Sequence, residues 1–377
     1  MAKLGRPGAD GDRSLFPVFG PQAMETLGFP SYHASAAFGG LPAGVGIAHA
    51  AGGDVGTGGL YRILVSDLPD PVDERQTVLA DLLAPEARIA SKYFYDPAGC
   101  ELFAEICRLP EYYLTRTEVA IFARYRRQIA AYLPMGAQWL DLGCGDGRKS
   151  HPWLDAIMAR RFIGVDIAHQ DLVQAVDSVA RSHRGIECLG VVTDLSRPLR
   201  LQALLYERAA WPTVVFYPGS SLGNFTPAAA IELLTGIREH LDDRGALLIG
   251  VDLVKETQFL EAAYDDDQEV TAAFNRNILR VVNRLADADF DPDQFDHWAT
   301  FAADASRIEM RLRARRPLTV HIGPHLRHFA AGETILTEYS YKFTVAGFVA
   351  MLDAAGFSRQ HIWTDQRGWF GVVLAQP

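Results

Sequence analysis

The stretch Trp139-Leu-Asp-Leu-Gly-Cys-Gly-Asp-Gly147 decides the fold of this chain. Its mostly apolar first half predicts a buried strand, and the three glycines that follow predict a tight loop at the end of that strand. Glycine can adopt a positive φ and lets a ligand approach the backbone closely. Such a loop is typical of cofactor sites in α/β proteins, although by itself it is equally compatible with a simple strand-to-helix turn.

Starting from this stretch, short apolar runs alternate with amphipathic segments. The expected strands cover residues 138–142, 162–165, 186–192, 213–217 and 246–251. The expected helices between them cover residues 149–159, 169–183, 198–207 and 227–241. This alternation predicts a doubly wound α/β fold, with a parallel sheet and right-handed crossovers. In such sheets ligands bind at the carboxyl ends of the strands.

The glycine spacing and the acids after the strands indicate the kind of cofactor. The loop from Gly143 to Gly147 reads G-x-G-x-G, whereas dinucleotide sites prefer G-x-G-x-x-G. The next expected strand ends at Asp166, where a carboxylate can accept from both hydroxyls of a ribose. The third ends at Asp194, which could accept from an adenine amino group. With Asp141 opening the motif, the set resembles the class I methyltransferases, which bind S-adenosylmethionine, although each acid alone could be a helix cap.

Two kinds of segment precede the alternating pattern. Residues 1–70 include a Gly- and Ala-rich run without clear periodicity, and we expect a loosely ordered extension there, outside the functional fold. The folded part is expected to begin near Pro71. Helices are expected over residues 72–83, 101–108 and 115–133. In the last of them, Thr115 followed three positions later by Glu118 predicts a capping box.

The alternating pattern stops after Val251. A helical pattern over residues 256–286 and antiparallel strand patterns over residues 297–328 follow. The pattern then closes with a helix and a hairpin, over residues 345–355, 358–364 and 369–375. We therefore expect an α+β substrate-binding lobe, inserted into a cofactor-binding domain. The expected bounds are 252–339 for the lobe, and 71–251 with 340–377 for the domain.

The composition argues against several other classes of protein. The 377 residues carry a net charge of −10, which disfavours a nucleic-acid partner, and the arginines within 311–316 alternate like the exposed face of an edge strand. The four cysteines show no C-x-x-C spacing. No apolar run reaches the roughly 20 residues that a membrane span needs. We therefore expect a cytoplasmic, monomeric protein with a small-molecule substrate and no membrane partner.

Three histidines lie close together, at positions 321, 325 and 328. Spacings of four and three would align them on one face of a helix, where they could bind a metal ion. The pair Gly323-Pro324 breaks any helix there, so we place the histidines in a loop or at strand ends and expect no metal.

Short motifs outside the glycine loop point to a narrower family. They are Tyr-Phe-Tyr-Asp at 93–96, Arg-Leu-Pro-Glu-Tyr-Tyr at 108–113, Gly-Asn at 223–224, Asp-Leu-Val-Lys at 252–255, Ala-Tyr-Asp-Asp at 263–266, Phe-Asn-Arg-Asn at 274–277, Arg-Ile-Glu-Met at 307–310 and Leu-Thr-Glu at 336–338. With these motifs the chain, from about Lys92 onward, resembles the histidine Nα-methyltransferases of ergothioneine biosynthesis. The resemblance implies methylation of the α-amine of L-histidine by S-adenosylmethionine, up to the trimethylated product hercynine.

The resemblance also implies roles for individual residues. The residues expected to contact S-adenosylmethionine are Gly143, Gly145, Lys149, Asp166, Asp194 and Leu195. The catalytic residues expected beside the substrate amine are Tyr95 and Tyr112. The residues expected to bind the substrate are Tyr112, Asn224, Tyr264, Met310, Glu338 and Ser340. Among these, Asn224 and Tyr264 would hold the carboxylate, and the last three would line the imidazole pocket.

The side-chain chemistry fits these roles, but each residue also has a simpler interpretation. Methyl transfer needs a neutral amine in line with a sulfonium carbon, and tyrosine hydroxyls can accept from that amine and orient it. Glu338 and Ser340 share one face of an expected strand and could serve the two ring nitrogens. By position alone, however, the tyrosines are ordinary half-buried residues, Met310 is a core residue, Glu338 faces solvent and Lys149 is a surface residue.

Two alternative functions stay open on the sequence alone. One is the same chemistry on another amine, such as an aromatic amino acid. Tryptophan fits less well, because it offers one N–H group and no second ring nitrogen for Ser340. The other is a nicotinamide-dependent oxidoreductase, against which the short glycine spacing argues.

Overall fold

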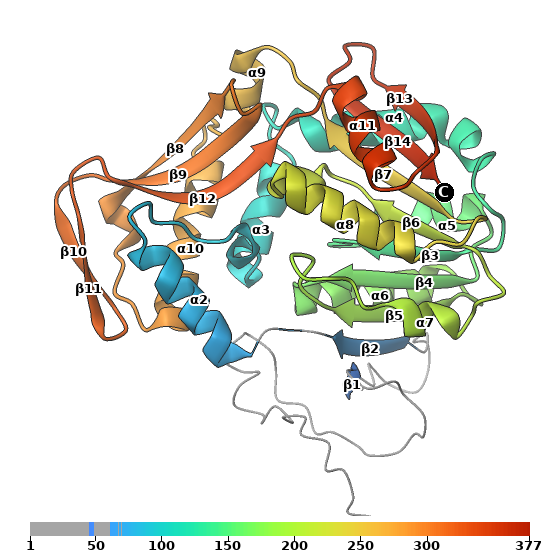
Figure 1. The fold of residues 1–377 in the computed structure, drawn as a ribbon, viewed down its shortest axis with the longest axis horizontal. Helices are drawn as coiled ribbons and strands as arrows, with labels where there is room; N and C mark the ends of the chain where they lie inside the picture. Colours follow the sequence, from blue (N-terminus) through green and yellow to red (C-terminus); the bar gives the residue numbers. More distant parts are fainter. Residues whose placement is uncertain (1–44, 49–60, 67, 69) are drawn as a thin grey trace, which may run out of the picture.

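The fold is built on one large sheet (Figure 1). The computed structural model describes residues 45–48, 61–66, 68 and 70–377. Within these residues, nine strands form the sheet, in the order β1-β2-β5-β4-β3-β6-β7-β14-β13. Their bounds are β1 Val45–Ala48, β2 Tyr61–Ser66, β3 Gln138–Leu142, β4 Arg161–Asp166, β5 Glu187–Val192, β6 Thr213–Tyr217, β7 Ala246–Asp252, β13 Arg359–Thr364 and β14 Phe370–Gln376. The pairs from β2 to β7 are parallel, whereas β1, β14 and β13 pair antiparallel.

Helices cover both faces of the sheet, which is why its central strands are apolar throughout. One layer contains α4, α5 and α6, and the other contains α7, α8 and α11 (Figure 1). Their bounds are α4 Tyr113–Ala130, α5 His151–Ala156, α6 His169–Ser182, α7 Gln202–Tyr206, α8 Pro227–Glu239 and α11 Val345–Ala354. Successive residues of β3 face opposite layers. Trp139 packs against Trp153 and Phe216, whereas Leu140 belongs to the core around Leu234 on the other face.

This architecture confirms the doubly wound α/β fold expected from the sequence. β3 and β6 have the predicted bounds, β5 and β7 differ by one residue at one end, and β4 is one residue longer at each end. The chain places β4 on one side of β3 and β6 on the other, so the glycine loop after β3 lies at the switch point of the sheet. α5 is shorter than predicted, because Ser150 closes a turn with Gly147 and Met158 adopts a φ of 49°.

The expectation that the folded part begins near Pro71 is wrong for residues 61–66. This segment forms β2, which pairs parallel with β5 and extends the sheet. Ile63 and Leu64 are buried on opposite faces of the sheet, and this burial favours a strand here. The glycine-rich sequence before it gave no sign of a folded element. β1 pairs with the free edge of β2. The rest of the predicted extension lies outside the described residues, apart from residues 68 and 70.

The substitution Ile63→Ala tests whether β2 contributes to the stability of the sheet. We expect it to lower the free energy of unfolding by about 2–5 kcal/mol, because Ile63 is 1 % exposed within the main core. The neighbouring Arg62 is about 40 % exposed and bonds only to surface acids, so Arg62→Ala should cost less than about 1 kcal/mol. Equal losses in chemical denaturation would contradict a structural role for β2.

A smaller lobe lies beside the large sheet (Figure 1). It contains a three-stranded antiparallel sheet in the order β12-β9-β8, a hairpin of β10 and β11, and the long helix α10. The bounds are α9 Thr257–Ala262, α10 Val270–Ala286, η3 Pro292–Gln294, β8 Phe295–Ala302, β9 Arg307–Ala314, β10 Leu318–Ile322, β11 His325–Phe329 and β12 Thr334–Tyr341. The single helix expected over residues 256–286 is wrong, because the carboxylate of Asp266 accepts from Val270 N and Thr271 N and so starts α10 separately.

The helices that precede the large sheet in sequence pack on this lobe. They are α2 Pro71–Leu83, η1 Ser91–Phe94 and α3 Pro97–Ile106. All three contact α10. The chain segment from η1 to the start of α4 therefore runs between the lobe and the large sheet, where it can contribute residues to a site shared by both.

Candidate active site

The glycine loop after β3 leaves open space beside its backbone. Gly143, Gly145 and Gly147 have φ values of 64°, 51° and 70°. A Cβ atom at Gly143 or Gly145 would meet no atom within 4 Å, whereas one at Gly147 would lie 3.1 Å from the Cβ of Ala175 in α6. Gly147 therefore allows close packing of a helix, and the other two glycines leave room for a ligand.

Asp166 lies at the end of β4, beside this loop. Its Oδ2 accepts from Gly145 N at 2.9 Å, and its Oδ1 accepts from Ala168 N at 2.9 Å. Burial raises the pKa of this carboxyl above its usual value, against the effect of these backbone donors. Each carboxylate oxygen has about two acceptor positions, so one stays available on each for a diol such as a ribose. Asp166 thus supports α6 through Ala168 and still fits the predicted ligand role.

Asp194, at the end of β5, has partners that the sequence did not reveal. Its Oδ2 accepts from Lys92 Nζ at 2.9 Å, and its Oδ1 accepts from Ser196 N and Oγ at 2.8 and 2.6 Å. Burial raises its pKa, but the Lys92 ammonium and the Ser196 bonds outweigh this and lower it. Lys92 Nζ also lies 2.6 Å from Glu74 Oε1. Asp194 is therefore ionised and held in place next to Leu195, which is half-buried.

Lys149 pairs with a buried acid. Its Nζ donates to Glu118 Oε2 at 2.6 Å, and Glu118 Oε1 accepts from Gly219 N at 2.8 Å. The predicted capping box is wrong, because α4 begins at Tyr113 and Glu118 points into the protein with a fully buried side chain. Gly250 makes room for this carboxylate, since a Cβ there would lie 2.0 Å from Glu118 Oε1.

A separate pocket opens next to the loop that follows β6. The pocket and its mouth, which is open to solvent, together contain about 540 Å³ that protein atoms do not occupy. All the predicted catalytic and substrate-binding residues line it, namely Tyr95, Tyr112, Asn224, Tyr264, Met310, Glu338 and Ser340. They come from segments far apart in the chain. Tyr95 follows η1 and Tyr112 precedes α4, Asn224 ends η2 (Ser221–Asn224), Tyr264 lies between α9 and α10, and the other three lie on the lobe strands β9 and β12. Lining residues that sequence reasoning missed include Phe103, Gly219, Ser220, Thr271 and Phe274.

One wall of the pocket is aromatic. The rings of Tyr112 and Tyr264 meet edge to face with centroids 6.3 Å apart, and Phe103 contacts Tyr112 in the same way at 6.2 Å. Phe274 contacts Tyr95 at 6.3 Å. Burial raises the pKa of Tyr95 and of Tyr112 well above the usual value, so both stay phenols at neutral pH. Such a wall can accept from an amine through the phenol oxygens and can face a cation with its rings.

A second wall of the pocket is polar and lies on β12. Glu338 and Ser340 point into the pocket from the same face of the strand, and Glu338 lies opposite Met310 of β9. The solvent-facing alternative for Glu338 is therefore wrong. Burial raises the pKa of Glu338 to about 7, although the nearby Lys342 ammonium opposes the shift. Ser340 Oγ lies 2.7 Å from Tyr264 Oη, so the polar wall continues onto the aromatic one.

The pocket and the glycine loop are connected through Gly219. Gly219 lines the pocket, its N–H donates to Glu118, and a Cβ on it would lie 3.5 Å from Lys149 Nζ. Lys149 in turn follows directly on the glycine loop. A ligand bound over Gly143 and Asp166 can therefore reach toward the pocket residues from the side of the large sheet.

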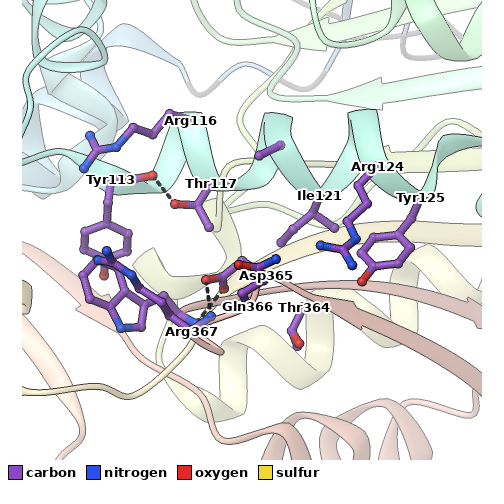
Figure 2. Close-up of a pocket in the computed structure, with 12 residues that line it drawn as sticks. Tyr113, Arg116, Thr117, Ile121, Arg124, Tyr125, Thr364, Asp365, Gln366 and Arg367 are labelled. Atoms are coloured by element: carbon purple, nitrogen blue, oxygen red, sulfur yellow. Dashed lines mark hydrogen bonds between the residues drawn. The ribbon is translucent and has the colours of Figure 1, made fainter.

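A wider groove elsewhere contains none of the predicted site residues (Figure 2). It lies between α4 and the hairpin of β13 and β14, and its lining includes Arg116, Arg124 and Arg367. Asp365 in this groove accepts from the backbone N–H groups of Arg367 and Trp369, so it stabilises the hairpin turn. The groove is therefore not the candidate active site.

The three neighbouring histidines lie on the β10–β11 hairpin. His321 Nδ1 lies 2.9 Å from Asp289 Oδ2, and His328 Nδ1 lies 2.7 Å from Thr319 Oγ1. Within residues 61–66, 68 and 70–377, no group of three or more His, Cys, Asp or Glu side chains is arranged to hold a metal ion. Among the helices that the structure describes, none is both long and apolar enough to cross a membrane.

Comparisons with known proteins identify the family. The family model described as histidine-specific, S-adenosylmethionine-dependent methyltransferases matches residues 74–377. A histidine N-alpha-methyltransferase of Mycolicibacterium smegmatis is 42 % identical over 308 residues, covering 80 % of this chain and 94 % of that protein. Its counterpart from Mycobacterium tuberculosis is 38 % identical over 307 residues, with the same coverage. The ergothioneine biosynthesis protein 1 of Schizosaccharomyces pombe is 27 % identical over 265 residues, which cover 68 % of this chain and 34 % of that protein. The chain therefore belongs to the family of histidine-specific, S-adenosylmethionine-dependent methyltransferases.

Proposed function

We propose that this protein transfers methyl groups from S-adenosylmethionine to the α-amine of L-histidine, up to hercynine, as a step of ergothioneine biosynthesis. The observation that carries the proposal is the convergence of all seven predicted catalytic and substrate-binding residues on one pocket. That pocket adjoins the glycine loop through Gly219 and Lys149. The family assignment leaves no support for the oxidoreductase that the glycine loop alone allowed.

The cofactor would lie along the carboxyl ends of β3, β4 and β5. Gly143 and Gly145 leave room for it, and Asp166 has free acceptor positions for its ribose hydroxyls. We assign the adenine end to Asp194 and Leu195. Bound there, S-adenosylmethionine would supply an electrophilic methyl group on a sulfonium centre.

Lys149 lies beside the glycine loop of the cofactor site. Its ammonium uses one N–H group on Glu118 and has others for a cofactor carboxylate. Because Glu118 also accepts from Gly219 N, one buried acid fixes both the cofactor lysine and the loop that forms the pocket edge. Glu118 thereby positions the cofactor site at the glycine loop and the substrate pocket relative to each other.

The substrate would lie in the pocket with its amine toward the cofactor. Tyr95 and Tyr112 would accept from the neutral amine and orient its lone pair, since both remain phenols. Asn224 and Tyr264 would hold the carboxylate, and Glu338 with Ser340 would bind the two ring nitrogens, beside Met310. Methyl transfer is a displacement, so the residues contribute chiefly by placing the amine and excluding water. The aromatic wall would then face the cation that forms.

The same residues suggest how the chain is divided. We infer that residues 252–339 form the substrate lobe, and that residues 71–251 and 340–377 form the methyltransferase domain. Tyr264, Met310 and Glu338 come from the lobe and Asn224 comes from the domain, while Ser340 lies at the boundary, on the lobe strand β12. One chain supplies all of them, so the proposal requires no second subunit.

The substitution Glu118→Gln tests the connection between the cofactor site and the substrate pocket. The amide oxygen can still accept from Gly219 N, but the charge that holds Lys149 is lost. We expect the KM for S-adenosylmethionine to rise about 10- to 100-fold, which corresponds to one charge-assisted hydrogen bond, with a smaller rise for histidine. Gly250→Ala should act in the same direction, because its Cβ displaces Glu118. An unchanged KM in steady-state kinetics of Glu118→Gln would contradict this role.

The choice of substrate is open to a direct test. The alternative is another amine, such as an aromatic amino acid, and tryptophan would leave Ser340 without a ring nitrogen to bind. The protein would be incubated with S-adenosylmethionine and an equimolar mixture of amino acids, and the products analysed by mass spectrometry. We expect methylated histidine as the main product. Preferential methylation of tryptophan or of another amino acid would refute the proposed substrate.

A further inference from the structure

A buried lysine lies directly behind the polar wall of the pocket. Lys342 follows β12 and is 3 % exposed. Its Nζ donates to Tyr264 Oη and to Ser340 Oγ, each at 2.8 Å, and lies 3.0 Å from Asp252 Oδ2. Lys342 does not line the pocket, but it contacts two of the residues that do. It can therefore affect the substrate through these two residues and through its charge.

The hydrogen bonds among Lys342, Tyr264 and Ser340 leave one hydroxyl proton that can point into the pocket. The ammonium has three N–H groups, and these three partners use all of them. Tyr264 and Ser340 carry one hydroxyl proton each, and their oxygens lie 2.7 Å apart, so one hydroxyl donates to the other. Because both oxygens accept from Lys342, a single O–H group remains to donate to a ligand. The two hydroxyls therefore act as one donor.

The charges around the lysine set the electrostatics of the polar wall. Lys342 shares Asp252 with a second buried lysine, Lys255, whose Nζ lies 2.6 Å from Asp252 Oδ1. Tyr113 also bonds to both oxygens of Asp252. Two ammonium groups thus surround one carboxylate, with Glu338 as the next acid toward the pocket. Burial lowers the pKa of Lys255 to about 8, so Lys342 is the firmer of the two charges, and a further cation placed next to Ser340 would be repelled by the Lys342 ammonium.

The groups that face Glu338 are consistent with this picture. They are the phenols of Tyr95, Tyr112 and Tyr264 and the ammonium of Lys342. Burial raises the pKa of Glu338 to about 7, and Lys342 is the cation that opposes the shift. The ionised form of Glu338 can accept one ring N–H group, which leaves the second ring nitrogen to Ser340.

We propose that Lys342 is a positioning residue that makes the pocket select the neutral imidazole ring of histidine. Its two hydrogen bonds turn Ser340 into a donor toward the unprotonated ring nitrogen, and its charge disfavours the imidazolium. In this arrangement Tyr264 donates to Ser340 and has no proton for the substrate carboxylate, so the inference revises the role proposed above for Tyr264 and leaves the carboxylate to Asn224. The proposal rests on histidine as the substrate.

Calorimetry of histidine binding tests this inference. Binding would be measured near pH 6 and pH 8 with S-adenosylhomocysteine present, in buffers of different ionisation enthalpy, so that released protons are counted. Histidine enters solution partly as the imidazolium at pH 6, because its ring pKa is near 6.5. On binding, the wild-type protein must release that proton and the one on Glu338, and it releases the α-ammonium proton of histidine as every variant does. Lys342→Met is expected to tolerate the imidazolium. At pH 6 we therefore expect this variant to release about one proton fewer than the wild-type protein on binding histidine.

The affinities provide a second readout. At pH 8 we expect Lys342→Met to bind histidine about 10- to 100-fold more weakly, while its affinity for S-adenosylhomocysteine stays unchanged. Lys255→Met is the matched control, because it removes the other buried ammonium beside Asp252 without touching Tyr264 or Ser340. It should retain the wild-type proton release. If Lys342→Met does not fold, Lys342→Gln, which keeps N–H donors without the charge, should show the same reduced release.

The possible failures are distinguishable. If the wild-type protein does not bind histidine at all, the proposed function is wrong. If it binds histidine but Lys342→Met or Lys342→Gln has wild-type proton release, the role of Lys342 is refuted and the function stands. If Lys255→Met reproduces the effect of Lys342→Met, the net charge of the cluster, rather than Lys342 itself, governs the ring, and the inference is also refuted.

Discussion

Replacing Asp166 by alanine is expected to weaken binding of S-adenosylmethionine by about 100-fold or more. The carboxylate would bind two ribose hydroxyls, and hydrogen bonds to a charged group contribute about 1.5–3 kcal/mol each. The substitution also removes the acceptors for Gly145 N and Ala168 N, so the glycine loop loses its support. Isothermal titration with S-adenosylhomocysteine measures the effect.

The matched control for this prediction is Asp146→Ala. Asp146 lies in the same glycine loop, but its side chain is 55 % exposed and pairs with Arg148. Its removal should change the affinity for the cofactor by less than about threefold, as for an ordinary surface ion pair. A wild-type affinity in Asp166→Ala, or an equal loss in both variants, would refute the placement of the ribose.

Replacing Glu338 by alanine is expected to weaken histidine binding by at least about 100-fold and to leave cofactor binding unchanged. A site built to hydrogen-bond a ring strongly rejects a ligand once its partner is missing. Glu309→Ala is the control, because Glu309 lies on the neighbouring strand and is fully engaged with Arg307 and Arg311. Equal losses of histidine and of S-adenosylhomocysteine affinity in titrations of Glu338→Ala would contradict the pocket assignment.

The same carboxyl makes a prediction about stability. Burial raises the pKa of Glu338 from 4.5 to about 7 in the folded protein. The folded state therefore binds the proton more tightly than the unfolded state, so the contribution of Glu338 to stability is lost as the pH rises from about 4.5 through about 7. Glu338→Gln, which cannot ionise, should lack this loss. Denaturation of the free protein at pH 5 and pH 8 compares the two.

The strands and the glycine loop could be predicted from the sequence because their signals are local. Each central strand is a short apolar run, and the glycine loop after β3 and the acid at the end of β4 can be recognised without knowing how the helices pack. The convergence of Tyr95, Asn224 and Glu338 on one pocket could not be predicted from local sequence signals. It depends on contacts between distant segments, and only the resemblance to a known family placed these residues together in advance.

The residues that sequence reasoning missed act through tertiary contacts. Glu118 fits a capping box by its spacing from Thr115, but the fold places its carboxylate between Lys149 and Gly219 instead. By sequence Lys342 resembles an exposed residue at the end of a strand, but in the fold it is buried in contact with Tyr264, Ser340 and Asp252. The strand β2 was missed because the glycine-rich sequence before it suggested that no folded element was near.

The central claim is that the pocket presents the α-amine of histidine, and not its ring, to the methyl donor. The most direct measurement incubates the protein with L-histidine and isotopically labelled S-adenosylmethionine, and locates the label in the product by NMR. The account predicts up to three labelled methyl groups, all on the α-nitrogen, because Glu338 and Ser340 hold the ring nitrogens. Label on a ring nitrogen, or no transfer to histidine, would contradict it.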